Sequence, residues 1–232
     1  MKKHLLRFAI ALFLTSGVAH AGDWGNLGKG MAPVVPHVDC LSYDYVDLEY
    51  IYTDYGTPKF DDGHGYGIGF SKSLGSAFFL TGSFSDSGYD YDWDGHIVDV
   101  DTRRYRMGLG TNIPLAKCVD FTFEGGFDHL DAEYTYHPDH DYDSWAYYFG
   151  PGIRARAGAF EVYAKIFYFS REGDLSQYYL SQHTFSHGRV DEDGWLFTPG
   201  IIYHFTDSFG LKVGAEIDQY NTAFLLGARF HY

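Results

Sequence analysis

The chain of 232 residues has few basic residues, with 17 Lys and Arg against 31 Asp and Glu. A surface that neutralises nucleic-acid phosphates needs the opposite balance, so nucleic acid is excluded as the main partner. Beyond the N-terminus, no apolar run is long enough for a membrane-spanning helix. Apolar residues make up 45% of the chain, but they are not concentrated in the Leu, Ile, Val and Ala that fill helical cores. This composition disfavours a helical bundle.

Aromatic residues and glycine are abundant instead: the chain has 21 Tyr, 20 Phe, 4 Trp and 28 Gly. Apolar residues recur at every second position, which is the period of a β-strand. Ten segments follow this period. The first two are residues 43–55 and 64–72, and the others begin near Phe78, Arg104, Val119, Tyr147, Phe160, Trp195, Phe209 and Phe224. The length suits a single domain.

The first 21 residues have the pattern of a secretory signal. A positive start is followed by the apolar run Phe8–Leu14 and by a small-x-small site at Ala19–Ala21. We therefore expect residues 1–21 to be removed and residues 22–42 to form an N-terminal periplasmic segment. Removal leaves 14 basic against 31 acidic residues.

The two faces of each predicted strand differ in character. In the first segment, Val46, Leu48 and Tyr50 share one face, whereas Asp47 and Glu49 share the other. Across the chain, this second face holds glycines and charges of both signs. A soluble sandwich would carry Ser, Thr, Lys and Glu there, with few glycines. A closed barrel in a membrane fits better, because small residues leave room inside for long side chains and closure removes every strand edge.

The connections alternate between short turns and longer polar stretches. Turns are expected at residues 73–76, 114–117, 157–158 and 206–208, and long loops near 56–63, 86–97, 130–143 and 172–193. This alternation is typical of a bacterial outer-membrane barrel. We predict an all-β, closed, antiparallel, up-and-down transmembrane barrel over residues 43–232, with ten strands and eight as the alternative. Pro151 and Pro199 are expected to cause local bulges.

The C-terminal segment Thr222–Tyr232 ends on an aromatic residue after apolar residues at alternating positions. On these patterns, the chain resembles the small outer-membrane β-barrel proteins, the OmpX/Ail- and OmpA-type barrels. The resemblance implies location in the outer membrane, contact with its lipid and lipopolysaccharide, and recognition of strand 222–232 by the barrel-assembly machinery. The best-known members have eight strands, and the ten predicted here depart from them.

Charged side chains on the inward face form the main candidate site. They are Asp47, Glu49, Arg104, Arg106, Asp120, Glu124, Asp128, Arg154, Arg156, Lys165, Lys212, Glu216 and Arg229. Counting back from the turn at 114–117 places Arg106 across from Glu124 and Arg104 close to Asp128. Buried charges must be paired, so we expect a salt-bridged plug that fills the lumen. A narrow porin-like channel is the alternative.

Two cysteines, Cys40 and Cys118, fall at the same end of the predicted barrel, just before the first and fifth strands. A disulfide between them is expected in an oxidising compartment, and two free thiols are the alternative. The bond would tie the N-terminal segment to the barrel mouth.

The predicted outer loops mix carboxylates with imidazoles, as in Asp86–His96 and His137–Asp143, with His183 and His187 in the longest loop. A cation site is one interpretation, but the Asp-x-Asp-x-Asp run lacks the later Glu of an EF-hand. Hydrated acidic loops available to a partner are the preferred interpretation, with no metal site and no cofactor.

We therefore expect a non-catalytic protein that acts in surface interaction, adhesion or envelope integrity, with a host or surface ligand at the loops. Enzymes are a second alternative. An omptin-like protease would need paired Asp and an Asp–His couple, which no motif here matches. A lipid A deacylase would need Ser near the outer end, but His204 and Thr206 fall at the turn end.

Overall fold

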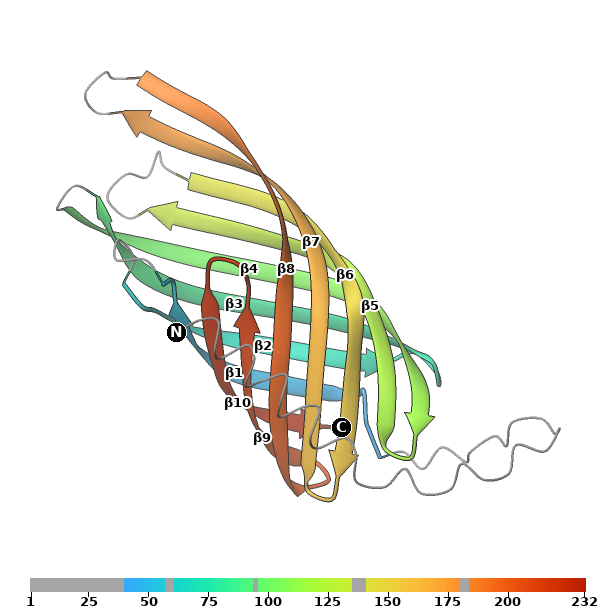
Figure 1. The fold of residues 1–232 in the computed structure, drawn as a ribbon. Coiled ribbons are helices and arrows are strands. Elements are labelled where there is room, and N and C mark those ends of the chain that lie inside the picture. The colour runs from blue at the N-terminus through green and yellow to red at the C-terminus, as the bar shows by residue number, and fades with distance from the viewer. Residues whose placement is uncertain (1–39, 57–60, 94–95, 135–140, 180–183) are drawn as a thin grey trace. The chain divides into compact units, whose positions relative to one another are not determined.

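A computed structural model of the chain describes residues 40–56, 61–93, 96–134, 141–179 and 184–232. Ten strands run through these ranges (Figure 1): β1 Tyr45–Asp54, β2 Gly63–Ser73, β3 Phe78–Trp93, β4 His96–Ala116, β5 Val119–Tyr134, β6 Asp141–Ala157, β7 Phe160–Tyr179, β8 Thr184–Thr206, β9 Phe209–Ile217 and β10 Thr222–His231. Within the same ranges, no helix is long and apolar enough to cross a membrane. The signal segment 1–21 and residues 22–39 lie outside the described residues.

The strands form one closed antiparallel barrel in which each strand pairs with its neighbours in sequence and β10 pairs with β1. The prediction of a closed ten-strand barrel is confirmed, and the eight-strand alternative is wrong. The strand period decides which side chains face out. Tyr66 is 72% exposed on the outside, whereas Asp47 is 3% exposed inside. An apolar exterior around a polar interior is the reverse of a soluble protein and suits a lipid surround.

The strands on one side of the barrel wall are short, and those on the other side are long. The neighbouring strands β9, β10, β1 and β2 have 9, 10, 10 and 11 residues, about the length that crosses a bilayer. The other six have 16 to 23 residues and continue as tall hairpins, which Figure 1 shows most clearly for β7 and β8. We call this the hairpin end and the opposite end the turn end.

The prediction of a long loop is therefore wrong in three places. Most of 86–97, 130–143 and 172–193 is strand, as the bounds of β3 to β8 show. The outward face of these stretches is polar, so the apolar outer face that reveals a strand in lipid is missing. Their backbone groups still pair across each hairpin, which maintains the ladder beyond the apolar belt.

The turn at 114–117 is also misplaced. Strand β4 continues through Pro114 to Ala116, and a register shift lies between these two residues. The chain then reverses at Lys117 and Cys118, with Cys118 in the left-handed region at φ 61°. The bulges expected at Pro151 and Pro199 are wrong, because the register is unchanged on both sides of each proline. A missing N–H removes one hydrogen bond but needs no extra residue.

Glycines on the inner wall make room for inward aromatic rings. Gly110 lies directly across from Phe79, and a Cβ at position 110 would overlap the Phe79 ring. Gly200 stands in the same relation to Tyr163. Rings can therefore lie flat against the wall, which fills a narrow lumen without displacing the strands.

Candidate functional site

The charged lumen begins at the seam where the last strand meets the first. Asp47 of β1 and Arg229 of β10 are direct cross-strand partners. Arg229 donates two hydrogen bonds to the Asp47 carboxylate, at 2.7 and 2.8 Å. Lys212 of β9 donates to the same carboxylate at 2.9 Å and also pairs with Glu49. Three of the four short strands thus meet on one carboxylate.

A second cluster lies nearer the turn end around Glu161 of β7. Arg154 of β6 donates to Glu161 from Nε at 3.0 Å and from Nη2 at 2.6 Å. The ring of His204 lies 3.1 Å from the other carboxylate oxygen of Glu161. Arg229 lies 3.6 Å from the same oxygen that Arg154 contacts. All of these side chains are buried. Arg229 therefore links the seam to the β6–β8 wall.

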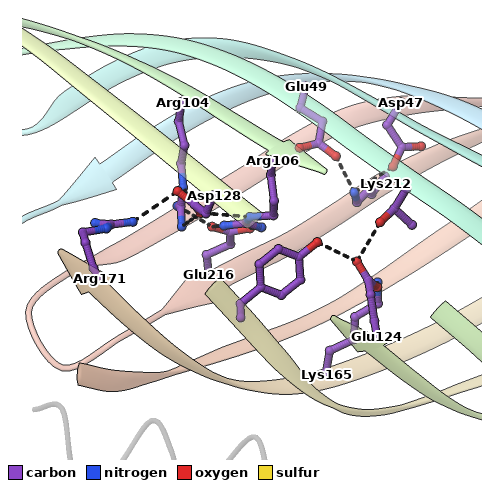
Figure 2. Close-up of polar contacts among 12 residues, drawn as sticks. Asp47, Glu49, Arg104, Arg106, Glu124, Asp128, Lys165, Arg171, Lys212 and Glu216 are labelled. Carbon is purple, nitrogen blue, oxygen red and sulfur yellow. Dashed lines mark hydrogen bonds and ion pairs between the residues drawn. The ribbon is translucent and has the colours of Figure 1, made fainter. Parts of the chain in front are cut away.

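The third cluster surrounds Asp128 of β5, on which three arginines converge (Figure 2). Arg104 and Arg106 donate from Nε at 2.7 and 3.2 Å, and Arg171 of β7 donates at 3.2 Å. Glu216 of β9 lies across the lumen and pairs with Arg104 and Arg106 at 3.4 and 3.0 Å. These contacts run from one wall of the barrel to the other.

The expected partner of Arg106 is therefore wrong. Arg106 lies opposite Asp128, and the residue opposite Glu124 is Gly110. Glu124 instead pairs with Lys165 at 2.7 Å, and Thr81 donates to it at 2.9 Å. The difference follows from the position of the turn, because β4 extends further than the count assumed. Arg104 does lie close to Asp128, as expected from the sequence.

In the part of the chain that the structure describes, seven lumenal cations lie among seven carboxylates, and Glu192 and Asp218 add further carboxylates toward the hairpin end. The cations are Arg104, Arg106, Arg154, Lys165, Arg171, Lys212 and Arg229, and the carboxylates are Asp47, Glu49, Asp120, Glu124, Asp128, Glu161 and Glu216. Burying ions costs several kcal/mol each unless partners compensate, so removal of one partner is strongly destabilising. These paired charges therefore link the strands of the barrel to one another across the lumen.

Arg156 differs from the other predicted lumenal residues. Its guanidinium lies at the turn end, where it donates to the carbonyls of Gly158 and Cys40 and lies 3.6 Å from the exposed Asp207. Two members of the network, Glu161 and Arg171, were absent from the predicted set. Glu161 alternates with Phe160 and Val162, a signal that could have identified it. Arg171 falls next to a stretch that looked like a loop.

A cavity of about 500 Å³ remains inside the barrel. It extends from Asp218 and Tyr220 at the hairpin end to Arg154 and Arg229 near the turn end. Small residues of β2 and β3 form one wall, and Arg104, Arg106 and Lys212 lie among the residues of the others. The ion pairs brace the lumen but do not fill it completely.

Cys40 and Cys118 form a disulfide, with their Cα atoms 5.1 Å apart. Beside it, Asp44 accepts a hydrogen bond from the Ser73 amide at 2.9 Å and pairs with Lys72 at 3.1 Å. Partial burial opposes ionisation of Asp44, but these two contacts hold its pKa below the ordinary value. The segment before β1 is thus fixed to the barrel by covalent and polar contacts.

The tall hairpins carry exposed ion pairs. Arg189 contacts Glu172 across β7 and β8 at 2.6 Å and Asp191 at 3.0 Å. His129 lies 2.8 Å from Asp143. Of the predicted imidazoles and carboxylates, Asp94, His137, Asp139, His140 and His183 lie outside the described residues. In the parts that the structure describes, no three His, Cys, Asp or Glu side chains gather as metal ligands.

Two carboxylates face each other on the β3/β4 hairpin. Asp90 lies across from Asp99, beyond Phe84, the last apolar residue on the outer face of β3. The hydrogen bond that Asp90 shares with Asp99 raises the pKa of Asp90, and partial burial and the negative charge of Asp99 act in the same direction.

No family model and no curated protein matches the sequence. Solved structures do resemble the barrel. The translocator domain of autotransporter NalP from Neisseria meningitidis has 7% identity and a TM-score of 0.47, over 84% of this chain and 90% of that one. Ail, the attachment invasion locus protein of Yersinia pestis, has 11% identity and a TM-score of 0.36, over 81% and 95%. The NanC porin has 9% identity and a TM-score of 0.47, over 81% and 100%.

At these identities, no ligand or activity transfers from those proteins to this chain. The architecture stands on the chain's own geometry. A closed antiparallel wall, an apolar outer surface and a paired ionic interior are the features of a small outer-membrane β-barrel.

Proposed function

We propose that the protein is integral to a bacterial outer membrane and acts at the cell surface, where its tall hairpins contact a partner in adhesion or in maintaining the envelope. The turn end would face the periplasm and the hairpin end the exterior. The observation that best supports this proposal is that three hairpins extend beyond the apolar belt. The ion-paired lumen then has a structural role, and the protein acts without catalysis.

The β7/β8 hairpin illustrates the extension. Trp195 is 62% exposed on the outer face, as expected for a ring at a membrane interface. Strand β8 begins at Thr184, so 11 residues precede Trp195, which corresponds to roughly 35 Å at 3.3 Å per residue. Glu172, Arg189 and Asp191 are exposed on this projection. Such a surface is available to a protein or glycan partner.

Trimming the hairpins tests this role. Deleting 175–188 joins Asp174 to Arg189, which are cross-strand partners, and leaves the membrane part of both strands intact. Equivalent trims in β3/β4 and β5/β6 complete the set. Cells with all three trims should lose binding to immobilised matrix and host surfaces, or lose resistance to detergent and serum. Asp207→Asn at the turn end is the matched control.

Heat-modifiable mobility on gels and surface labelling verify that each trimmed barrel is folded and inserted. If the triple trim keeps full binding and full resistance, the proposal is wrong. Outer-membrane lipid, lipopolysaccharide and the assembly machinery, through strand 222–232, remain the proposed general partners. Protease and lipid A modification assays on intact cells test the proposed absence of catalysis, because activity above that of a deletion strain would contradict it.

A further inference from the structure

The residues that precede β1 enter the barrel at its turn end. Leu41 and Tyr43 are only 5% and 7% exposed, although both lie outside any strand. The Tyr43 ring stacks on Phe79 at 4.7 Å, and its hydroxyl donates to Asp120 at 3.0 Å. Since Phe79 and Asp120 belong to β3 and β5, Tyr43 lies against the inner wall at the mouth. We call residues 41–43 the stopper.

Covalent and polar contacts hold the stopper in place. Cys40 is bonded to Cys118, in the turn between β4 and β5. Arg156 donates to the Cys40 carbonyl at 3.3 Å, and Arg154 donates to the Ser42 carbonyl at 3.1 Å. The only covalent tether among these contacts is the disulfide. Its loss leaves residues 41–43 joined to β1 through Asp44 and held by hydrogen bonds, by the stacked Tyr43 ring and by the Arg154 guanidinium over that ring.

The stopper lies next to the turn-end part of the lumenal cavity. Arg154 lines the cavity, and its guanidinium also lies over the Tyr43 ring at 4.4 Å. Arg229 lines the same end of the cavity. The cavity thus continues from the hairpin end to the side chain that contacts Tyr43. Tyr43 is thus one contact removed from this cavity, on the side of the turn end and beside the buried Glu161 cluster.

We infer that the barrel is a closed channel whose mouth at the turn end is shut by a disulfide-tethered stopper, and that reduction of the disulfide opens it. A dithiol would attack the Cys40–Cys118 bond as a thiolate. It supplies two electrons and two protons and becomes a disulfide itself, while Cys40 and Cys118 become thiols. The opened channel would pass small hydrated ions, because the ion-paired network still narrows the lumen. This activity is independent of a surface role of the hairpins.

Planar-bilayer recordings on the purified full barrel test the inference. Oxidised protein should give no steady conductance, and dithiothreitol in both chambers should produce a defined single-channel level. Cys40→Ser should conduct without reductant and should not respond to it. Ser42→Ala is the matched control within the stopper, because among the described residues the Ser42 hydroxyl hydrogen-bonds to the Asp44 backbone and not to the barrel wall. This control should remain closed until the disulfide is reduced.

A second variant separates the stopper from the tether. Leu41→Ala/Tyr43→Ala keeps both cysteines but removes the buried side chains, so it should conduct while oxidised. Heat-modifiable mobility verifies folding of each sample. Alkylation of Cys40 by a bulky maleimide after reduction reports whether the mouth has opened. If the reduced wild type is folded and alkylated at Cys40, and both open variants are folded, but all three are silent, the lumen is closed elsewhere and the inference is wrong. Protection of Cys40 after full reduction would equally overturn it.

Discussion

Arg229 and Asp47 close the barrel: the guanidinium of the last strand donates two hydrogen bonds to a buried carboxylate of the first, at 2.7 and 2.8 Å. Backbone pairing alone could join β10 to β1, but this contact also links the seam to Lys212 and Glu161. Because a bidentate pair is directional, it favours one register of closure over its neighbours. The seam is therefore specified by side chains as well as by the ladder.

The first prediction concerns this seam. Asp47→Ala should destabilise the folded barrel by about 3 to 5 kcal/mol, because Arg229 and Lys212 would remain buried without their main partner. Urea unfolding in lipid vesicles, followed by tryptophan fluorescence, measures the loss. Asp207→Asn is the control, since Asp207 is fully exposed and solvent screens its 3.6 Å contact with Arg156, so its loss should leave the unfolding curve unchanged. Equal effects of the two substitutions would refute a special role for the seam.

The second prediction concerns the partner of Arg106. A double-mutant cycle between Arg106→Gln and Asp128→Asn should give a coupling energy of about 0.5 to 3 kcal/mol, because the two side chains are in contact at 3.2 Å. The same cycle with Glu124→Gln should give a smaller value, since Glu124 pairs with Lys165. A larger coupling to Glu124 would mean that the register between β4 and β5 differs from the one described.

The third prediction concerns glycine on the inner wall. Gly110→Ala should destabilise the barrel by about 1 to 3 kcal/mol, because the added Cβ overlaps the Phe79 ring and forces it off the wall. Gly67→Ala is the matched control: it also faces the lumen, but the atom nearest its added Cβ, on Ile51, lies 3.4 Å away. Unfolding midpoints of the two variants in the same detergent provide the comparison. A Gly110 variant as stable as the control would show that the ring can move freely.

The fourth prediction is a pH dependence in the β3/β4 hairpin. The pKa of Asp90 is raised in the folded state by its shared hydrogen bond with Asp99, so the folded hairpin binds its proton more tightly than the unfolded chain. The stabilisation is full below the ordinary aspartate pKa and is lost as the pH rises through the raised value. Amide hydrogen exchange near Asp90, corrected for intrinsic rates, should therefore show stronger protection in acid.

Asp99→Asn provides the control for that experiment. The substitution removes the second negative charge, so it should lower the Asp90 pKa and flatten the pH dependence of protection. NMR titration of the Asp90 carboxyl carbon measures the pKa directly. An unchanged midpoint in the variant would assign the shift to a cause other than Asp99.

Much of the fold could be predicted from the sequence because the relevant signal is local. Apolar residues at every second position identify each strand in lipid, and the same period places Asp47, Glu124 and Arg229 inside. The heights of the hairpins could not be predicted, because the outward face of each strand becomes polar beyond the lipid and the apolar outer face no longer marks the strand. The cysteine pair placed the N-terminal segment at the barrel mouth, but the burial of Leu41 and Tyr43 could not be predicted, since neither residue carries a feature that distinguishes a buried lumenal segment from the start of a strand.

The sequence by itself determined which face each side chain occupies, and the tertiary structure decided which side chains meet. Arg106 was expected opposite Glu124 and lies opposite Asp128, four residues further along the same strand. A shift by an even number of residues leaves every side chain on its face, so the alternation cannot detect it. The partner depends on where the chain turns and on the irregularity between Pro114 and Ala116, which only the folded ladder reveals.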